Sequence, residues 1–452
     1  MGMKGLLGVG AVCSLSVGLL FACGGDGNAG LPGSGGVAGS GGANSGGAGG
    51  TSSGGTSSGG SAGSGGNFGG AAGAGGASGG TGAVDGGGAG GTGPTCNSKP
   101  TDDQDKDGFT GAEGDCDDCD PKVNPGAIEA PTKTGATPKD DDCNGKVDDL
   151  PAACDDAVAL DEPDPAIAAK SIELCKKPAN DKDWGLVSAK WTLPDGVGIP
   201  TGSEANYHLG HGALSAFGTN GKVQAGKRML GLSSGTARQP ADPGYQDVSG
   251  FDKGFKSASP PGYPKESPAC PNVTTGEPHD GVALEVMVRA PTNAVAFSFD
   301  SNFYTFEWPS YVCSEYNDFF LALMAPTPAG LADPNVLYDA QANLISVNSA
   351  LLDVCGCASG PPCTAGTKSY SCAQGPTLLA GTGFGKDSSG GVDHGATGWL
   401  VTTVPVEGGK TFSMRFTVHD SSDGILDSTA LVDNFTWLFS DAPSKPTTIA
   451  KP

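Results

Sequence analysis

The sequence predicts a mainly β protein: an antiparallel β-sandwich or jelly-roll-like domain, preceded by a small acidic loop module and a disordered Gly/Ser linker. Three observations carry this prediction. After residue 155 about ten short apolar segments are separated by Gly, Pro, Asn and Asp, as in antiparallel sheets. Phe412, Met414, Phe416 and Val418 alternate with other residues and so share one strand face. Glycine makes up 35 of the 72 residues in 24–95.

The first 22 residues have the pattern of an export signal. Lys4 precedes an apolar stretch that is too short for a transmembrane span and ends in small residues. The run Leu20-Phe21-Ala22-Cys23 resembles a bacterial lipobox, in which the cysteine becomes the lipidated first residue. An ordinary signal peptide with an incidental cysteine is the alternative. We expect residues 1–22 to be a lipoprotein signal peptide and Cys23 to be the lipidation site. The protein would then be exported and lipid-anchored to the cell envelope, at the outer membrane or cell surface.

Residues 23–95, after this signal, form the linker. They carry almost no large apolar side chains, so nothing offsets the entropy cost of ordering the backbone. We expect a flexible tether between a membrane and the rest of the chain. The net charge of −23 argues against a nucleic-acid partner, whose phosphates require Lys and Arg. Without Cys13 and Cys23, twelve of the 14 cysteines remain, and an even number in an exported chain predicts disulfides.

The segment 96–150 carries 15 Asp or Glu against 6 Lys. Asp103, Asp105 and Asp107 place carboxylates at alternate positions, and Gly108 permits a sharp turn. Ca²⁺ binds 6–8 oxygens, many of them charged, on a loop of this kind. An EF-hand does not fit, because position 12 is Gly114 instead of Glu and no helices flank the loop. The run DCNGKVDD, residues 142–149, repeats the alternation. A solvated acidic spacer is the alternative.

These residues resemble the metal-binding motif of bacterial surface proteins, which runs D-x-D-x-D-G, DCDD-x-DP, PGA-x-E and D-x-D-C-D/N-G-x-x-D. The thrombospondin type 3 repeat, which binds Ca²⁺, is similar in its first part. The chain departs from the motif in having Cys119 inside DCDD-x-D and in lacking a cysteine shortly after Glu129. A Cys116–Cys143 disulfide is one option among several. The resemblance implies that Ca²⁺ is bound by Asp103, Asp105, Asp107, Asp115, Asp117, Asp118, Asp120, Asp142, Asn144 and Asp148.

The domain at 155–440 begins with a predicted helix over 164–177, for which Asp164–Pro165 is the start signal. Strands are predicted after it, and the tail 441–452 is polar and expected to be frayed. The predicted strands are 186–191, 212–217, 228–232, 281–289, 294–300, 318–324, 344–348, 398–406, 411–419 and 429–439.

Several stretches of this domain resemble the bacterial choice-of-anchor L domain. They include WGLVSAKW (184–191), HLGHGALSAFG (208–218), the long run at 279–323 and TGWLVTTVPVEGG (397–409). The resemblance extends through nearly all of 160–440. It implies a β-rich cell-surface module, and the family has no defined biochemical activity.

Candidate sites within this domain each have a structural alternative. Gly231-Leu-Ser233-Ser-Gly235 matches the nucleophile elbow G-x-S-x-G, but the following residues do not predict the helix that the elbow needs, and a turn is favoured. His208 and His211 form H-x-x-H without further ligands at confirming spacing, so a buried or turn-stabilising pair is favoured over a metal site.

Three further stretches carry polar or cysteine clusters. A second candidate metal site is a hairpin turn or a Ca²⁺ site formed by Asp420, Asp423, Asp427 and Asp433. The aromatic run 303–320 is expected to pack in the core; sugar stacking near Glu307, Asn317 and Asp318 is the alternative. The cysteines 355, 357, 363 and 372 are expected to form disulfides instead of a Zn²⁺ cluster.

The sequence as a whole predicts a non-catalytic cell-surface lipoprotein with a Ca²⁺-binding stalk and a β-sandwich domain for recognition or adhesion. Its expected partners are the membrane, through the lipid, and an extracellular glycan or matrix protein. The alternatives are an extracellular hydrolase and a metal-scavenging surface protein.

Overall fold

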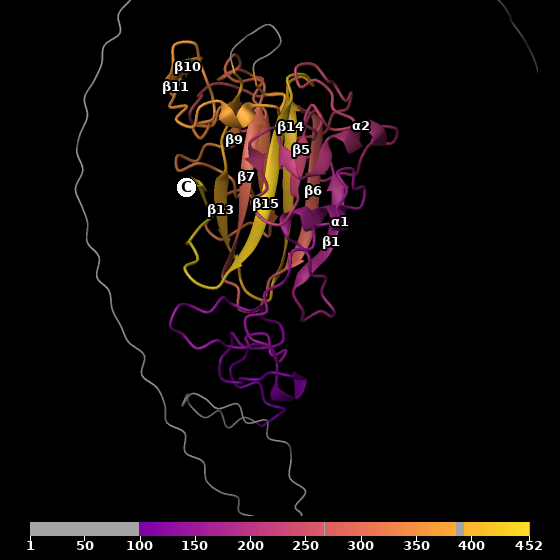
Figure 1. Cartoon of the computed structure of the whole chain (residues 1–452), viewed down its shortest axis with the longest axis vertical. Coiled ribbons are helices and arrows are strands. Elements are labelled where there is room, and N and C mark those ends of the chain that lie inside the picture. The colour runs from indigo at the N-terminus through magenta and orange to yellow at the C-terminus, as the bar shows by residue number, and fades with distance from the viewer. Residues whose placement is uncertain (1–98, 266, 386–392, 452) are drawn as a thin grey trace, which may run out of the picture. The chain divides into compact units, whose positions relative to one another are not determined.

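The computed structural model describes residues 99–265, 267–385 and 393–451, and its regular structure is mainly antiparallel β (Figure 1). The predicted signal peptide, Cys23 and the linker lie outside these residues. In the described part of the chain, none of the helices has the length and apolarity of a membrane span.

Two antiparallel sheets face each other in the domain. The five-stranded sheet has the order β1-β6-β14-β8-β9, and the seven-stranded sheet has the order β16-β13-β7-β15-β5-β2, with β12 also paired to β7. The first contains β1 (Gly185–Thr192), β6 (Pro278–Arg289), β14 (Thr411–Ser421), β8 (Phe319–Ala325) and β9 (Ile345–Ser346). The second contains β2 (His211–Leu214), β5 (Met229–Ser233), β7 (Ala296–Thr305), β12 (Gly395–Ala396), β13 (Leu400–Pro405), β15 (Ser428–Leu438) and β16 (Thr447–Ala450).

The remaining elements are short. Two hairpins pair β3 (Ala216–Phe217) with β4 (Gly221–Lys222) and β10 (Cys363–Ala365) with β11 (Lys368–Tyr370). The helical elements are η1 (Gly111–Glu113), α1 (Pro165–Ala168), η2 (Ala169–Ile172), α2 (Glu204–Leu209) and η3 (Thr377–Leu379). The mainly β prediction is confirmed, and each of the ten predicted strands overlaps a strand of the structure. The jelly-roll connectivity stays a prediction.

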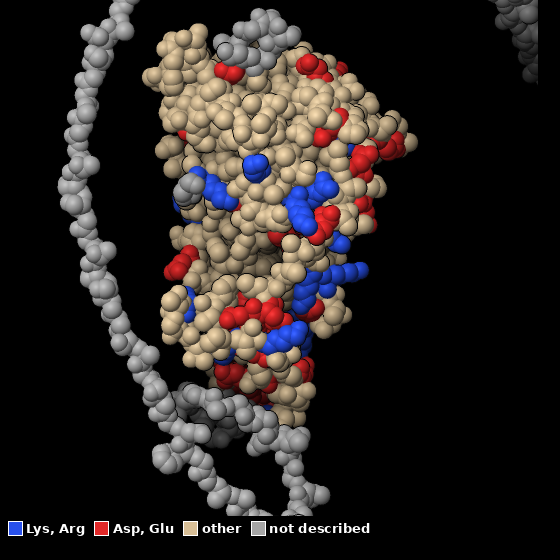
Figure 2. Space-filling view, viewed as in Figure 1, with Lys and Arg blue, Asp and Glu red and all other residues tan. Residues whose placement is uncertain are grey.

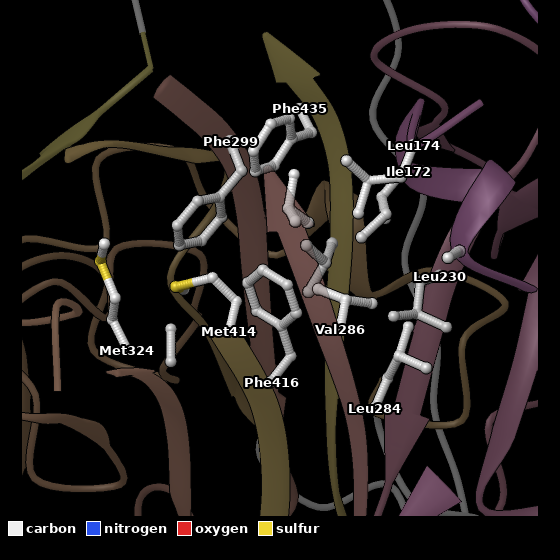
Figure 3. Close-up of a cluster of buried hydrophobic side chains, with 14 of the residues drawn as sticks. Ile172, Leu174, Leu230, Leu284, Val286, Phe299, Met324, Met414, Phe416 and Phe435 are labelled. Carbon is white, nitrogen blue, oxygen red and sulfur yellow. The ribbon is translucent and has the colours of Figure 1, made fainter. Parts of the chain in front are cut away.

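The core lies between the two sheets, where large apolar side chains from both meet (Figure 3). Phe412, Met414, Phe416 and Val418 of β14 are all buried, which confirms the predicted alternation. Phe297 of the opposite sheet stacks on Phe412 with ring centroids 5.1 Å apart. Aromatic pairs of this kind add stability beyond the area that they bury.

Two predictions at the ends of the domain are wrong. The predicted helix 164–177 is only α1 followed by η2, because Glu173 takes a left-handed conformation with φ of 64° and ends it. Asp164 does cap the start, since its side chain accepts a hydrogen bond from the Ala166 N–H. The tail is not frayed: β16 pairs with β13, and the Lys451 ammonium contacts the Asp300 carboxylate.

The described cysteines are all disulfide-bonded, Cys119 among them. The Cys116–Cys143 option is realised, and cysteines 355, 357, 363 and 372 form disulfides as predicted. Five of the disulfides are Cys116–Cys143, Cys154–Cys175, Cys270–Cys313, Cys355–Cys372 and Cys357–Cys363.

The acidic module docks onto the sandwich through the loop between β6 and β7. The Asn293 side chain accepts a hydrogen bond from the Ile128 N–H (3.2 Å) and donates one to the Ile128 carbonyl (2.7 Å). Next to it, the Thr292 N–H donates to the Gly126 carbonyl (3.0 Å), and the Thr292 hydroxyl donates to the Asn124 side chain (2.8 Å). These bonds fix the module against one end of the sandwich.

Candidate metal centre

The first acidic loop of the module uses its carboxylates to bind its own backbone. Asp103 Oδ2 accepts a hydrogen bond from the Gly108 N–H (3.2 Å). Asp105 Oδ1 accepts from the Asp107 N–H (3.2 Å), and Asp107 Oδ1 accepts from the Phe109 N–H (2.8 Å). Each bond closes a tight turn, which is how short Asp side chains stabilise loops.

A second loop repeats this pattern thirty-seven residues later, the separation of Asp103 and Asp140. Asp140 Oδ2 accepts a hydrogen bond from the Gly145 N–H (2.8 Å). Asp142 Oδ1 accepts from the Asn144 N–H (3.2 Å), and Asn144 Oδ1 accepts from the Lys146 N–H (2.9 Å).

The two loops also share their backbone conformation. Lys106 and Gly108 in the first, and Cys143 and Gly145 in the second, have positive φ at equivalent positions. The φ of 98° and 87° at the two glycines is a conformation that favours residues without a Cβ atom. The second loop therefore begins at Asp140, one alternate position earlier than the sequence pattern suggested.

In and directly after the first loop, four carboxylates each keep one oxygen that accepts no hydrogen bond. Oδ2 of Asp105, Asp107, Asp115 and Asp118 is buried and without a hydrogen-bond partner. Asp115 and Asp118 are 8% and 6% exposed, so these are buried side chains and not solvated ones. Oxygens of Asp105, Asp107 and Asp115 lie within 4.8 Å of one another, as do oxygens of Asp103, Asp105 and Asp118.

Burial of these carboxylates disfavours their charged form. It raises the pKa of Asp107 to about 6, and the nearby charges of Asp105 and Asp115 raise it further, against hydrogen bonds that lower it. The pKa values of Asp105 and Asp115 are also raised, first by burial. A divalent cation would remove this penalty by pairing with the oxygens that lack donors.

A second acidic group lies beside the second loop. Oxygens of Glu129, Asp142 and Asp149 lie within 4.8 Å of one another. The Glu129 carboxylate is 1% exposed and accepts hydrogen bonds from the backbone N–H groups of Asp141, Asp142 and Asp148. Glu129 belongs to the sequence motif, yet neither it nor Asp149 was among the ligands that the motif indicated.

Three predicted ligands point elsewhere. Asp117 and Asp120 form ion pairs with the Lys139 ammonium at 3.4 and 2.8 Å. Asp148 accepts two hydrogen bonds from the Thr132 hydroxyl and N–H at 2.9 and 3.2 Å. Figure 2 shows acidic side chains gathered in the lower part of the view, over the module, with lysines among them. Lys139 thus neutralises Asp117 and Asp120, whereas Asp105, Asp107, Asp115 and Asp118 each keep an unpaired oxygen.

In the sandwich, the structure brings only part of the second candidate metal site together. Asp420 and Asp427 flank the turn after β14 and are fully buried. Asp423 lies on the turn between them, where its carboxylate accepts from the Ile425 N–H. Asp433 is in the interior of β15 and accepts hydrogen bonds from the N–H groups of Gln224 and Asn434 instead.

Two acidic residues that are far away in the sequence lie near Asp420. Asp318 is its direct neighbour, and Glu307 lies beside Asp318. Asp318 is fully buried and accepts hydrogen bonds from the Ser421 N–H (3.1 Å) and the Ser428 hydroxyl (2.7 Å). Glu307 accepts from the Asp318 N–H (3.4 Å). The aromatic run that contains them packs inward as expected, since Phe303, Phe319 and Phe320 are buried.

The serine of the G-x-S-x-G pattern is buried. Its hydroxyl donates to the Ser428 carbonyl (3.1 Å) and accepts from the Thr429 hydroxyl (2.9 Å). These bonds tie the end of β5 to β15, which supports the reading as a turn.

The two histidines of H-x-x-H have separate partners. His208 pairs with the Asp161 carboxylate, while His211 stacks on Trp191 with centroids 3.8 Å apart. Burial, and then the neighbouring His208, lowers the pKa of His211 well below its usual range. His211 is thus an uncharged packing residue.

Comparison with known proteins found no matching family model, no matching curated protein and no matching solved structure.

Proposed function

We propose that the chain is a lipid-anchored protein of the cell envelope, in which a Ca²⁺-binding module holds a β-sandwich that recognises an extracellular glycan or matrix protein. One observation carries the metal part. Four buried carboxylate oxygens, on Asp105, Asp107, Asp115 and Asp118, have no hydrogen-bond donor. Leaving such charges buried and unpaired is costly, and a bound cation is the direct way to pair them.

The ligand chemistry favours Ca²⁺. Every candidate ligand is an oxygen, and hard cations prefer oxygen. Mg²⁺ keeps its water shell and demands strict octahedral geometry, whereas Ca²⁺ accepts irregular sets of 6–8 oxygens. The described part of the module brings neither His nor free Cys to this group, which disfavours the scavenging of softer transition metals.

We expect the cation to stabilise the conformation of the module and not to take part in a chemical reaction. The module buries only four apolar side chains in its described part, on Phe109, Val123, Ala127 and Ile128. A core of this size does not hold a segment in one conformation without disulfides or metals. Ca²⁺, together with the Cys116–Cys143 disulfide, would make the module a stiff joint at the base of the sandwich.

The surrounding features fit an exported protein. Disulfides persist in oxidising compartments and are rare where thiols are kept reduced. The lipobox-like Cys23 and the glycine-rich stretch after it supply the anchor and tether of this proposal. The resemblances to the metal-binding motif and to the choice-of-anchor L domain favour the same two roles, a cation-binding module and a cell-surface β-sandwich.

Thermal unfolding with and without Ca²⁺ tests the proposal. For a site at 100 times its Kd, bound ligand stabilises the fold by about 2.7 kcal/mol, so millimolar Ca²⁺ should raise the melting temperature of the full chain. Asp105→Asn with Asp118→Asn should reduce this rise. Asp117→Asn is the matched control, since Asp117 is paired with Lys139 in the same segment. Equal melting in excess chelator and in millimolar Ca²⁺ would sink the metal proposal.

The recognition part has its own test. A glycan and matrix-protein array probed with the full chain should give binding to a defined ligand class, reduced by chelator. Binding at background level throughout would remove recognition as the role while leaving the Ca²⁺ result standing.

A further inference from the structure

A second buried group of carboxylates lies in the sandwich, where the chain passes between the sheets. Asp420 is near the end of β14 in the five-stranded sheet, and Asp427 immediately precedes β15 in the seven-stranded sheet. Their side chains are 1% and 0% exposed. The turn that joins them thus carries a buried carboxylate at each of its two ends.

Neither carboxylate accepts a hydrogen bond in normal geometry: both oxygens of Asp420 and both oxygens of Asp427 are buried and without a donor, and Asp420 lies against the side chains of Asp318 and Ser234. Elsewhere in the domain, Asp280 accepts hydrogen bonds from the backbone N–H groups of Lys253 and Phe255, and Asp433 accepts from Gln224 and Asn434, whereas Asp155 keeps one unpaired oxygen and Glu173 keeps two. Among the buried aspartates of the described residues, Asp420 and Asp427 are the two with both oxygens unpaired.

The Asp427 carboxyl group occupies the place where a side chain at position 235 would begin. A Cβ atom at Gly235 would overlap the Asp427 carboxyl group, so only glycine leaves room for it. The G-x-S-x-G pattern therefore has a structural use here: its last glycine lets the side chain from the β14–β15 turn lie against the end of β5. The Ser234 hydroxyl lies in the same place and donates to the Ser428 carbonyl (3.2 Å).

The charge at this place is not balanced by the described residues. Asp318 lies beside Asp420, and Glu307 lies beside Asp318, so two further buried carboxylates are near. Lys253 is the cation that faces the group, and its ammonium donates to the Ser233 carbonyl (2.9 Å). Buried charges without partners cost several kcal/mol each, so the fold requires either bound protons or a further cation.

We infer that Asp420 and Asp427 hold a divalent cation, Ca²⁺ by its all-oxygen ligands, at a site separate from the module. In the described chain, the groups of three acidic side chains with oxygens within 4.8 Å of one another all lie in the module. The assigned carboxylate ligands of the sandwich ion are thus Asp420 and its neighbour Asp427, with neutral oxygens such as the Ser234 hydroxyl, which also lies beside Asp420, to complete the set. Ca²⁺ accepts such mixed ligands.

Such an ion joins the two sheets at one edge of the sandwich. β14 pairs with β6 and β8, while β15 pairs with β5 and β7. Asp420 extends the first set and Asp427 the second. Removing the ion leaves like charges facing each other across the turn, so the turn would loosen before either sheet does.

Equilibrium dialysis of the full chain with radioactive Ca²⁺, after chelator treatment, tests the assignment. The double variant Asp420→Asn and Asp427→Asn should bind one equivalent fewer than the wild type. Asp433→Asn, which replaces a buried aspartate of β15 whose oxygens have donors, should lose none. A chain whose module is disabled by Asp105→Asn, Asp118→Asn, Glu129→Gln and Asp142→Asn should retain one equivalent.

The outcomes separate this site from the module. If the module-disabled chain retains no Ca²⁺, the sandwich site does not exist, whatever the module does. If the folded Asp420/Asp427 variant binds as much Ca²⁺ as the wild type, protons neutralise the carboxylates and the assignment is wrong. If that variant does not fold, the module-disabled chain alone decides.

Discussion

Asn293 is the residue on which the rigidity of the module depends most directly. Its side chain is 4% exposed and satisfies both the N–H and the carbonyl of Ile128, two buried backbone groups of the module. Asn293→Ala would leave both without a partner. Each unsatisfied buried group costs about 1–3 kcal/mol, so we expect the docked state to weaken by roughly 2–6 kcal/mol.

This loss should be local. Because about 1.4 kcal/mol corresponds to a factor of ten in an equilibrium constant, amide exchange in the module should speed up about 30- to 20,000-fold. Core strands such as β6 and β14 should keep their protection. Hydrogen exchange followed by mass spectrometry reads both regions in one experiment. The Ca²⁺-dependent rise in melting temperature should shrink as well, since a detached module no longer stabilises the sandwich.

Asn335→Ala is the matched control. Asn335 is equally buried, and it also accepts from a backbone N–H (Ala322, 3.1 Å) and donates to a carbonyl (Leu337, 2.6 Å). These partners lie within the sandwich, so the variant should lose stability without loosening the module. If the two variants give the same exchange pattern, the docking through Asn293 is not what holds the module.

Two further predictions concern acidity and covalent links. Burial, and then the charge of Asp433, raises the pKa of Glu173 to about 8, so its stabilising effect is complete at low pH and is lost as pH rises through that value. Glu173→Gln should therefore reduce the fall in melting temperature between about pH 5 and about pH 9, and an unchanged fall would contradict the assignment. The Cys116–Cys143 bridge spans 27 residues, a loop for which about 3–4 kcal/mol of stabilisation is expected. Replacing both cysteines by serine should weaken Ca²⁺ binding of the module in calorimetry, and wild-type affinity would show that the disulfide does not organise the loops.

The strands of the sandwich could be predicted because their signal is local. A period of two in the sequence, as in β14, directly reports which side chains face the opposite sheet. The helix over 164–177 failed for a reason that is not local: Cys175 must reach Cys154, and the chain turns at Glu173 to do so. The order of the tail could not be predicted, because β16 is held by backbone pairing with β13, and such pairing needs no apolar pattern.

The metal residues divide in the same way. The clustering of Asp103, Asp105 and Asp107 could be predicted because their loop is continuous in sequence. The ion pairs of Asp117 and Asp120 could not, because Lys139, which pairs with them, lies far along the chain. Asp318 and Glu307 had no signal as partners of Asp420, since only the pairing of β8 with β14 brings the first of them near.

The Cys116–Cys143 disulfide also determines how a pulling force would travel through the module. Tension that enters at Cys116 leaves at Cys143 through the sulfur atoms, so the stretch between, with Asn124, Ile128 and Glu129, is not extended. The bonds that attach this stretch to the β6–β7 loop can then fail only if the module separates from the sandwich as a unit. The Cys154–Cys175 bridge likewise keeps α1 and η2 from being extended. Under tension along the chain, both disulfide-closed stretches would keep their length until a covalent bond failed.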